Sequence, residues 1–247
     1  MTADRSGVGT VHLVGSGPGD PELLTLKARR LIDSADVVMH DALPGPEIIA
    51  TIPEEAAEDV GKRANGERTP QSEIDDRIVA HAEAGREVVR LKGGDPTVFG
   101  RAGAELSTCI AAKIPVEVVP GVTSAIAGPA LAGIPVTHRD HASSVTVVTG
   151  HEAPDADAPP IDWEALAQSG GTIVVLMGVG SLDEYTAALA DGGLDPSTPV
   201  ALIERASWPD QRAVTGTLET IVGVRDREGV EPPAVTVIGD VVEAIES

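Results

Sequence analysis

The sequence is poor in aromatic residues and contains a single cysteine. Phenylalanine, tryptophan and tyrosine make up 2% of the 247 residues, whereas 42% are hydrophobic. The core must therefore be aliphatic, and the aromatic stacking platforms of single-stranded nucleic-acid binders are not expected. Because Cys109 has no second cysteine to pair with, an internal disulfide is excluded, which fits a reducing cytoplasm. Its place in a helical pattern predicts a buried structural thiol rather than a nucleophile.

The chain also lacks an apolar signal segment and an uninterrupted hydrophobic run. Its first ten residues have no apolar core, and residues 118–137, although uncharged, are interrupted by three prolines and three glycines. We therefore interpret residues 118–137 as a buried turn and helix rather than a membrane span. The expected location is the cytoplasm.

Positive charge is scarce. There are 39 acidic residues against 18 basic ones, a net charge of -21, and only four of the basic residues are lysines. A surface this acidic disfavours nucleic acid and anionic membranes as partners. Since the acidic residues are spread through segments that should fold, we hypothesise adaptation to a salt-rich cytoplasm, where screening weakens their mutual repulsion.

Apolar runs that alternate with helical spacing predict an α/β fold with mostly parallel strands and helices on both faces. Antiparallel pairing becomes plausible near the C-terminus. Pro120-Gly121 is the expected boundary between two α/β domains, residues 1–119 and 120–247. The expected strands are 10–14, 37–40, a short one ending near 60, 87–91, 116–119, 145–149, 172–177, 200–204, 212–216 and 234–238. The expected helices are 21–34, 47–52, 72–84, one ending at 112, 182–190 and 218–225.

Two helix starts carry capping signals. Asp20 followed by Pro21 is typical of an N-cap and first helical position, which predicts that the helix over residues 21–34 begins there. Residues 72–75, Ser-Glu-Ile-Asp, resemble a capping box for the helix that ends at Ala84.

The first glycine loop, residues 15–20, lies between a strand and a helix, as in nicotinamide-binding proteins. Its spacing fails the dinucleotide fingerprint, because Asp20 stands where the last glycine is required. Asp20 also places negative charge where a pyrophosphate would lie. A P-loop is excluded as well, since no Gly-Lys-Ser/Thr follows.

The second glycine loop lies in Val89–Arg101, VRLKGGDPTVFGR, which combines a short strand, a turn and a helix start. Gly93 and Gly94 allow close approach of the backbone to a ligand, and Pro96 restricts the exit of the loop. Asp95 argues against a phosphate and favours a ligand with hydroxyl groups or positive charge. An ordinary strand-to-helix connection explains the pattern equally well by itself.

Five blocks of sequence together resemble the tetrapyrrole methylases, in the same order and over nearly the whole chain. Within that family the resemblance is closest to stand-alone members that act on uroporphyrinogen III. The blocks are GSGPGDPELLTLKA at 15–28, VGKRA at 60–64, RLKGGDPTVFGR at 90–101, VPGVTSAIAGPALAGIPVTHR at 119–139 and VTGH at 148–151.

This resemblance implies an enzyme of two α/β domains, usually a homodimer, with S-adenosylmethionine in the cleft between the domains. It implies methylation of uroporphyrinogen III at C-2 and C-7, giving precorrin-2 with S-adenosylhomocysteine as the by-product. The N-terminal domain would carry the tetrapyrrole side and the C-terminal domain would complete the cofactor site. Whether the product goes to sirohaem or to cobalamin is left open.

The resemblance also assigns site residues. It makes Asp41 the proton acceptor, Lys62 the proton donor and Arg101 a catalytic and substrate-binding residue. Because the substrate carries eight carboxylates and the protein is acidic, a local basic wall is needed, and Lys62, Arg63, Arg101 and Arg139 are the candidates. No metal site is expected. The implied cofactor contacts are Pro18, Gly93, Gly94, Asp95, Val98, Thr123, Ser124, Met177 and Ala206.

Departures from the family pattern keep alternatives open. Thr97, Ala102 and Ala104 replace residues that are more often an aromatic, a glycine and a glutamate. They leave room for a methylase of a later corrin intermediate, such as precorrin-4. A diphthine synthase shares the fold but not the RLKGGDP block. A nicotinamide dehydrogenase and a non-catalytic ligand-binding protein are the alternatives from other classes.

Overall fold

The computed structural model describes residues 7–61, 69–151 and 159–244. The chain forms two compact units, Met1–Thr123 and Ser124–Ser247. Each unit has its own five-stranded sheet. The α/β fold class predicted from the sequence is confirmed.

The first unit is built on an entirely parallel sheet with the strand order β3-β2-β4-β1-β5. Four of these strands are rich in valine and leucine, and β1, β2 and β4 are buried along their whole length, as expected for parallel strands covered on both faces. In the central strand Leu13 pairs with Arg90 on one side and Val118 on the other. The strands are β1 (Val11–Gly15), β2 (Val37–His40), β3 (Ala57–Asp59), β4 (Val88–Lys92) and β5 (Val116–Val119).

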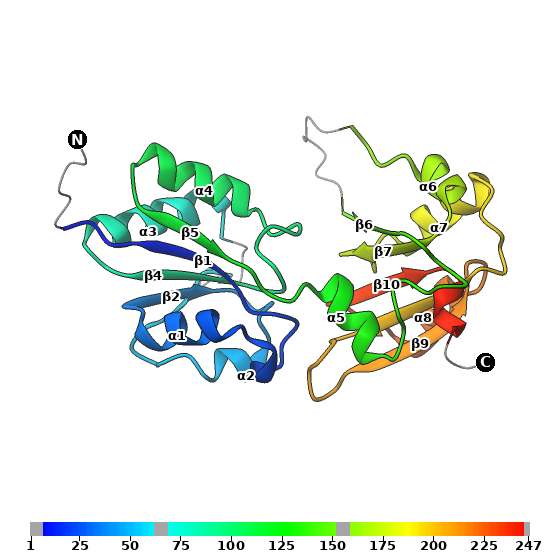
Figure 1. Ribbon diagram of the computed structural model, residues 1–247, viewed down its shortest axis with the longest axis horizontal. Coiled ribbons are helices and arrows are strands. Elements are labelled where there is room, and N and C mark those ends of the chain that lie inside the picture. The colour runs from blue at the N-terminus through cyan, green and yellow to red at the C-terminus, as the bar shows by residue number, and fades with distance from the viewer. Residues whose placement is uncertain (1–6, 62–68, 152–158, 245–247) are drawn as a thin grey trace. The chain divides into compact units, whose positions relative to one another are not determined.

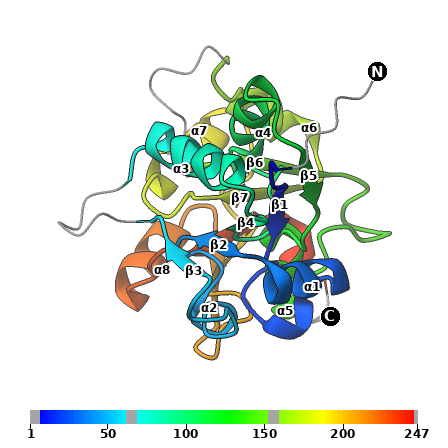
Figure 2. The ribbon, with the colours of Figure 1, turned by 90° about the vertical axis from the view of Figure 1, so that its left-hand side faces the viewer.

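Two pairs of helices cover this sheet. Helices α3 (Gln71–Glu83) and α4 (Ala102–Ala111) lie on one face, and α1 (Leu26–Ser34) and α2 (Pro46–Ile49) lie on the other (Figures 1 and 2). Each face has its own aliphatic core. The core under α3 and α4 contains Cys109, and burial raises the pKa of its thiol to about 11. The prediction of a buried structural cysteine is therefore confirmed.

The helix predicted over residues 21–34 is in fact two helices. Asp20 accepts a hydrogen bond from the backbone of Glu22, but it caps only the short 3-10 helix η1 (Pro21–Leu23). Leu24 is extended, and the hydroxyl of Thr25 accepts a hydrogen bond from Ala28 N at 3.1 Å, so Thr25 is the true N-cap of α1. The 3.6-residue pattern of leucines did not reveal this break.

The predicted capping box at residues 72–75 is wrong. Helix α3 begins at Gln71 behind Pro70, and no side chain of the described residues caps it. Pro70 has φ of -60° and ψ of 145°, so the chain enters the helix one residue earlier than predicted. Ser72 is already inside the first turn.

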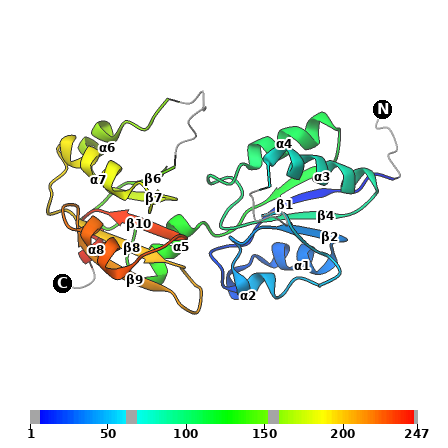
Figure 3. The same cartoon turned by 180° about the vertical axis from the view of Figure 1, so that it is seen from behind.

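The second unit has a mixed sheet with the strand order β6-β7-β10-β8-β9. Strands β6 and β7 are parallel, whereas β10 is antiparallel to both of its neighbours and β9 is antiparallel to β8. Figure 3 shows β10 between β7 and β8. The antiparallel pairing expected near the C-terminus is confirmed. The strands are β6 (Val145–Thr149), β7 (Thr172–Leu176), β8 (Pro199–Glu204), β9 (Arg212–Thr217) and β10 (Ala234–Ile238).

Helices α7 (Leu182–Asp191) and α8 (Ile221–Glu228) share one core with β7 and β8. Helix α5 (Ser124–Leu131) contacts β7 and β10. Helix α6 (Trp163–Ser169), which packs on α7, was not predicted from the sequence, although Asp162 caps it by accepting a hydrogen bond from Ala165 N at 2.9 Å. A 3-10 helix, η2 (Asp240–Glu243), follows β10.

The uncharged stretch at residues 118–137 contains the end of β5, a turn and α5, which is eight residues long. Within the ranges 7–61, 69–151 and 159–244, none of the helices combines the length and the apolar character that a membrane span requires.

Candidate active site

The candidate site of the first unit lies at the carboxyl ends of its parallel strands, which we call the carboxyl edge of the sheet. Because all five strands are parallel, the segments that follow Gly15, His40, Lys92 and Val119 leave the sheet at the same edge. In open α/β sheets, ligands bind at this carboxyl edge. The two glycine loops and Asp41 therefore meet there.

Glycines allow three segments to pack backbone against backbone at this edge. Gly17 and Gly94 exchange hydrogen bonds, with N–O distances of 3.1 Å from Gly17 N and 2.8 Å from Gly94 N. A Cβ on Gly15 would lie 2.6 Å from the carbonyl oxygen of Gly94, and a Cβ on Gly121 would lie 2.3 Å from the same atom. The first glycine loop, the GGDP loop and the turn after β5 thus form one glycine-packed cradle.

Asp95 connects two parts of this cradle. Its Oδ1 accepts hydrogen bonds from Thr97, at 2.8 Å from the backbone N and 2.5 Å from Oγ1. Its Oδ2 accepts a third hydrogen bond from Gly121 N at 3.1 Å. The carboxylate therefore holds the GGDP loop closed and attaches it to the turn after β5.

The end of the GGDP loop is conformationally strained. Phe99 and Arg101 have φ angles of 52° and 58°, in the left-handed region that non-glycine residues seldom occupy. Phe99 is exposed despite being apolar, and Arg101 is the exposed residue that precedes α4. Strain of this kind persists where the surroundings impose it and is concentrated at ligand-binding sites.

Asp41 follows β2 and is held by two hydrogen bonds. Its Oδ1 accepts one from Leu43 N at 2.9 Å, and its Oδ2 accepts one from Arg90 Nη2 at 3.2 Å. Gly93 packs against this turn so closely that a Cβ on it would lie 2.8 Å from the Cβ of Leu43. The Asp41 turn and the GGDP loop are therefore in direct contact.

Asp41 belongs to a polar cluster in which Arg90, Lys92 and Glu105 are buried and Asp41 and Gln71 are partly buried. Glu105 of α4 accepts hydrogen bonds from Arg90 Nε at 3.2 Å, Lys92 Nζ at 2.7 Å and Gln71 Nε2 at 3.3 Å. Burial lowers the pKa of Lys92, and the charge of Arg90 lowers it further, while Glu105 opposes both effects. No role was expected from the sequence for Arg90, Lys92, Glu105 or Gln71. Two basic residues two apart in an apolar strand could have signalled the cluster, because they share one buried face.

The structure leaves parts of the predicted basic wall undescribed. Lys62 and Arg63 lie outside the described residues. Arg101 belongs to the first unit, and no side-chain partner of it is found among the described residues. Arg139 belongs to the second unit, where it is exposed in the turn between His138 and Ala142.

The second unit has a corresponding edge. Strands β6, β7 and β8 run in the same direction, so Gly150, Met177 and Arg205 leave the sheet together. Met177 has a φ of 55° and is 52% exposed, which presents its thioether to solvent rather than to the core. A Cβ on Gly150 would lie 2.3 Å from Gly178 Cα, so the ends of β6 and β7 also pack through glycine.

Ala206, one residue beyond Arg205, is buried against α5. A Cβ on Gly128 of this helix would lie 3.6 Å from the Cβ of Ala206. Ser124, another predicted cofactor contact, is the first residue of the same helix. The second unit thus brings Ala206 close to the helix that carries Ser124.

A pocket of about 570 Å³ is found in the second unit. Met177 and His151 line it, as do Trp163 and Tyr185, whose rings stack with centroids 5.4 Å apart. Burial raises the pKa of Tyr185, whose hydroxyl lies 2.9 Å from Thr236 Oγ1. Tyr185 is thus a neutral, fixed wall of the pocket.

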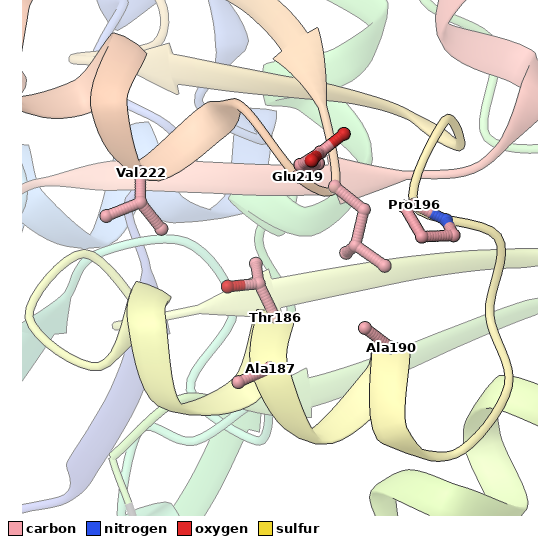
Figure 4. A pocket seen from close by; sticks show the side chains of 7 residues that line it. Thr186, Ala187, Ala190, Pro196, Glu219 and Val222 are labelled. Carbon is pink, nitrogen blue, oxygen red and sulfur yellow. The ribbon is translucent and has the colours of Figure 1, made fainter.

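A second pocket, of about 320 Å³, is shown in Figure 4. It lies between α7 and the start of α8, with Thr186, Ala190 and Val222 among its lining residues. Leu218, also in its wall, hydrogen-bonds to Thr198 at the amino end of β8, which is the opposite edge of the sheet from Met177. This pocket contains none of the predicted site residues. Among the residues that the structure describes, no group of three or more histidine, cysteine or acidic side chains could hold a metal ion.

The chain is similar to known proteins of one family. Residues 10–222 match the family of Tetrapyrrole (Corrin/Porphyrin) Methylases. The chain is 55% identical to the S-adenosyl-L-methionine-dependent uroporphyrinogen III methyltransferase of Methanosarcina barkeri, over 95% of this chain and 92% of that protein.

Solved structures of this family are also similar. Uroporphyrin-III C-methyltransferase from Thermus thermophilus, in complex with S-adenosylhomocysteine, is 42% identical with a TM-score of 0.80, covering 96% of this chain and all of that one. A cobalt precorrin-4 methyltransferase is 25% identical with a TM-score of 0.84, covering 94% and 95%. The resemblance found in the sequence is confirmed: the chain belongs to the tetrapyrrole methylase family.

Proposed function

We propose that this protein is an S-adenosylmethionine-dependent methyltransferase that methylates uroporphyrinogen III at C-2 and C-7, giving precorrin-2. The observation that carries the proposal is the convergence of Asp41, the glycine-packed cradle and Arg101 at one edge of the first sheet. The 55% identity to a methyltransferase named for the same cofactor and substrate supports it.

Both units offer contacts that suit S-adenosylmethionine. In the first unit, the glycines of the cradle leave their own backbone amides and carbonyls uncovered by side chains, so that a ligand can approach them. Asp95 adds a carboxylate for the hydroxyl or ammonium groups of the ligand. In the second unit, the exposed thioether of Met177 is a soft apolar contact. The proposed contacts of the first unit are Pro18, Gly93, Gly94, Asp95, Val98 and Thr123, and those of the second unit are Ser124, Met177 and Ala206.

When bound, the cofactor supplies an electrophilic methyl group. The chain's own contribution is then to hold the macrocycle in line with it and to move a proton. Asp41, with an oxygen held by Leu43 N and the other by Arg90, is the proposed proton acceptor. Lys62, outside the described residues, is the proposed proton donor.

The first unit also offers contacts for the macrocycle. Leu43, Phe99 and Val122 are exposed apolar side chains that flank the glycine-packed cradle. Exposed apolar groups around a recessed polar site are typical of ligand-binding edges. Arg101 is the proposed partner of the substrate's carboxylates, together with Lys62, Arg63 and Arg139. The first unit would accordingly serve the tetrapyrrole, and the second would complete the cofactor contacts.

Anaerobic incubation with uroporphyrinogen III and methyl-labelled S-adenosylmethionine in high salt tests the assignment. We expect two labelled methyl groups in each tetrapyrrole. Absence of label from the tetrapyrrole would contradict the proposed activity, whereas a single methyl would contradict only the extent of reaction.

A precorrin-4-type methyltransferase is the alternative, and its TM-score of 0.84 is the observation that favours it. Its lower identity, 25% against 55%, argues for uroporphyrinogen III. Parallel incubations with the two tetrapyrroles separate these functions, because faster labelling of precorrin-4 would support the alternative. Calorimetry with S-adenosylhomocysteine and with NAD tests the other classes: binding of NAD alone would indicate a dehydrogenase. Binding of neither S-adenosylhomocysteine nor NAD would favour a non-catalytic ligand-binding protein.

We further propose that the protein works as a homodimer in the cytoplasm. The lone buried Cys109 fits a reducing compartment. Sedimentation equilibrium in high salt should give twice the mass of one chain, and a single-chain mass at micromolar concentration would contradict the dimer.

A further inference from the structure

The guanidinium of Arg90 donates hydrogen bonds to three groups through Nε and Nη1, and its Nη2 donates to Asp41. Nη1 donates to the carbonyl oxygens of Leu91 at 2.8 Å and Met39 at 3.3 Å, and Nε donates to Glu105 at 3.2 Å. Nη2 donates to Asp41 at 3.2 Å. Because a guanidinium is planar, these anchors determine where the Nη2 group lies and so where it holds the Asp41 carboxylate.

Glu105 is the anchor that comes from outside the sheet. Its side chain is 0% exposed, compared with 5% for Arg90 and 26% for Asp41. It also accepts a hydrogen bond from Lys92, which lies on the same strand face as Arg90 and repels it. Without this carboxylate, Asp41 would be left as the acidic partner of two neighbouring buried cations, and Lys92 would lose the carboxylate that accepts its hydrogen bond. Arg90 would also lose its anchor on α4.

From this arrangement we infer that Glu105 is a positioning residue for the reaction: through Arg90 it sets the orientation of the Asp41 carboxylate at the sheet edge. Gln71 of α3 supports it by donating to the same oxygen that Arg90 uses, at 3.3 Å. The inference rests on the proposed role of Asp41 as proton acceptor. Helix α4, which begins just after the GGDP loop, thus controls the geometry of the Asp41 carboxylate at the end of β2.

Single variants Glu105→Gln and Arg90→Lys test this inference. Misplacement of a reacting group by about 1 Å can cost roughly 100-fold in rate. We therefore expect kcat to fall by between about tenfold and 100-fold, while KM for the tetrapyrrole and Kd for S-adenosylhomocysteine stay within about twofold of the wild type. Hydrogen–deuterium exchange should also become faster at the amide of Leu43, which donates to Asp41.

The matched control is Glu58→Gln. Glu58 pairs with Arg77 and His81 between strand β3 and helix α3 of the same unit, so this variant also removes a strand-to-helix ion pair. We expect it to leave kcat and the exchange of the Leu43 amide unchanged. The double variant Lys92→Met/Glu105→Gln removes one buried charge of each sign, and it replaces Glu105→Gln if the single variant does not fold.

Three outcomes separate the possible failures. If folded Glu105→Gln and Arg90→Lys retain wild-type kcat, the inference is overturned. It is also overturned if kcat, KM and the affinity for S-adenosylhomocysteine worsen in parallel, because that pattern indicates general loosening of the unit. Full activity of Asp41→Asn would instead overturn the proposed role of Asp41 itself.

Discussion

Thr97 donates both its backbone N–H and its hydroxyl to the same oxygen of Asp95, at 2.8 and 2.5 Å. In the sequence, Thr97 stands out only because it replaces a residue that is more often aromatic in the family. In the structure it closes the GGDP loop, whose Asp95 also holds the turn after β5 through Gly121 N.

This pair predicts that Thr97→Ala weakens cofactor binding. A hydrogen bond to a charged group contributes about 1.5 kcal/mol, and loss of the loop order it provides should weaken the affinity for S-adenosylhomocysteine, measured by calorimetry, by up to roughly tenfold. Thr97→Ser keeps the hydroxyl and should bind within about twofold of the wild type. Equal weakening in both variants would contradict the role of the hydroxyl.

Replacing Gly121 with alanine should destabilise the first unit. The new Cβ would meet the carbonyl oxygen of Gly94 at 2.3 Å, a contact that only a backbone shift can relieve. We expect a loss of about 2 kcal/mol or more in the free energy of unfolding, measured with urea. The control is Gly103→Ala on α4, where nothing lies within 4 Å of the added Cβ. Because alanine has a better helix propensity than glycine, Gly103→Ala should raise the free energy of unfolding by up to about 1 kcal/mol. A similar loss of stability in both variants would contradict the packing argument.

Arg101→Ala should abolish methyl transfer while binding of S-adenosylhomocysteine survives. Arg101 is exposed at the end of the GGDP loop, so its removal leaves no buried charge unpaired. Activity assays and calorimetry on the same preparation measure the two effects. Loss of cofactor binding would mean that Arg101 contacts the cofactor instead of the tetrapyrrole.

Glu117 predicts a pH dependence of stability. The pKa of its carboxyl is lowered by the hydrogen bond from Lys27 at 2.6 Å and, less strongly, by His12, with burial opposing them. A lowered pKa in the folded state means that the ionised form stabilises the fold above the ordinary pKa of about 4.3. This stabilisation is lost as the pH falls through the folded-state value.

Glu117→Gln should therefore lower Tm at pH 7, and the difference from the wild type should disappear at acidic pH. Differential scanning calorimetry at one fixed, moderate KCl concentration measures it, because salt weakens pairs as exposed as this one. A difference in Tm that does not change with pH would show that Glu117 contributes through packing.

The net charge of -21 predicts a stability that rises with salt. Screening should reduce the repulsion among acidic side chains, so the thermal unfolding midpoint should increase steadily with KCl concentration. Full stability in dilute buffer would contradict the hypothesis of adaptation to a salt-rich cytoplasm.

Local signals in the sequence were sufficient for most of the strands and for the family. The predicted strands 37–40, 116–119, 145–149 and 234–238 coincide with β2, β5, β6 and β10. Buried β-branched runs bounded by polar turns are local features, so they can be read without knowledge of the fold. The same holds for the glycine spacing that excluded nicotinamide and for the blocks that resembled the tetrapyrrole methylases.

Helix boundaries required the tertiary structure. Leu24 and Thr25 interrupt a leucine pattern that looked continuous, and Pro70 moves the start of α3 ahead of the apparent capping box. In both places several residues could have been the cap. The choice depended on where the chain had to enter the sheet, which is a non-local constraint.

The residues proposed for the site, namely the two glycine loops, Asp41, Asp95 and Arg101, could all be named from the sequence alone. Only the tertiary structure revealed how these parts are held, because Glu105 and Arg90 are 15 residues apart and Arg90 and Asp41 are 49 apart. Parallel strands bring such residues to one edge, and burial then requires each charge to find a partner. The local pattern of Arg90 and Lys92 in an apolar strand can signal that buried charges need partners, but packing decides which residues those partners are.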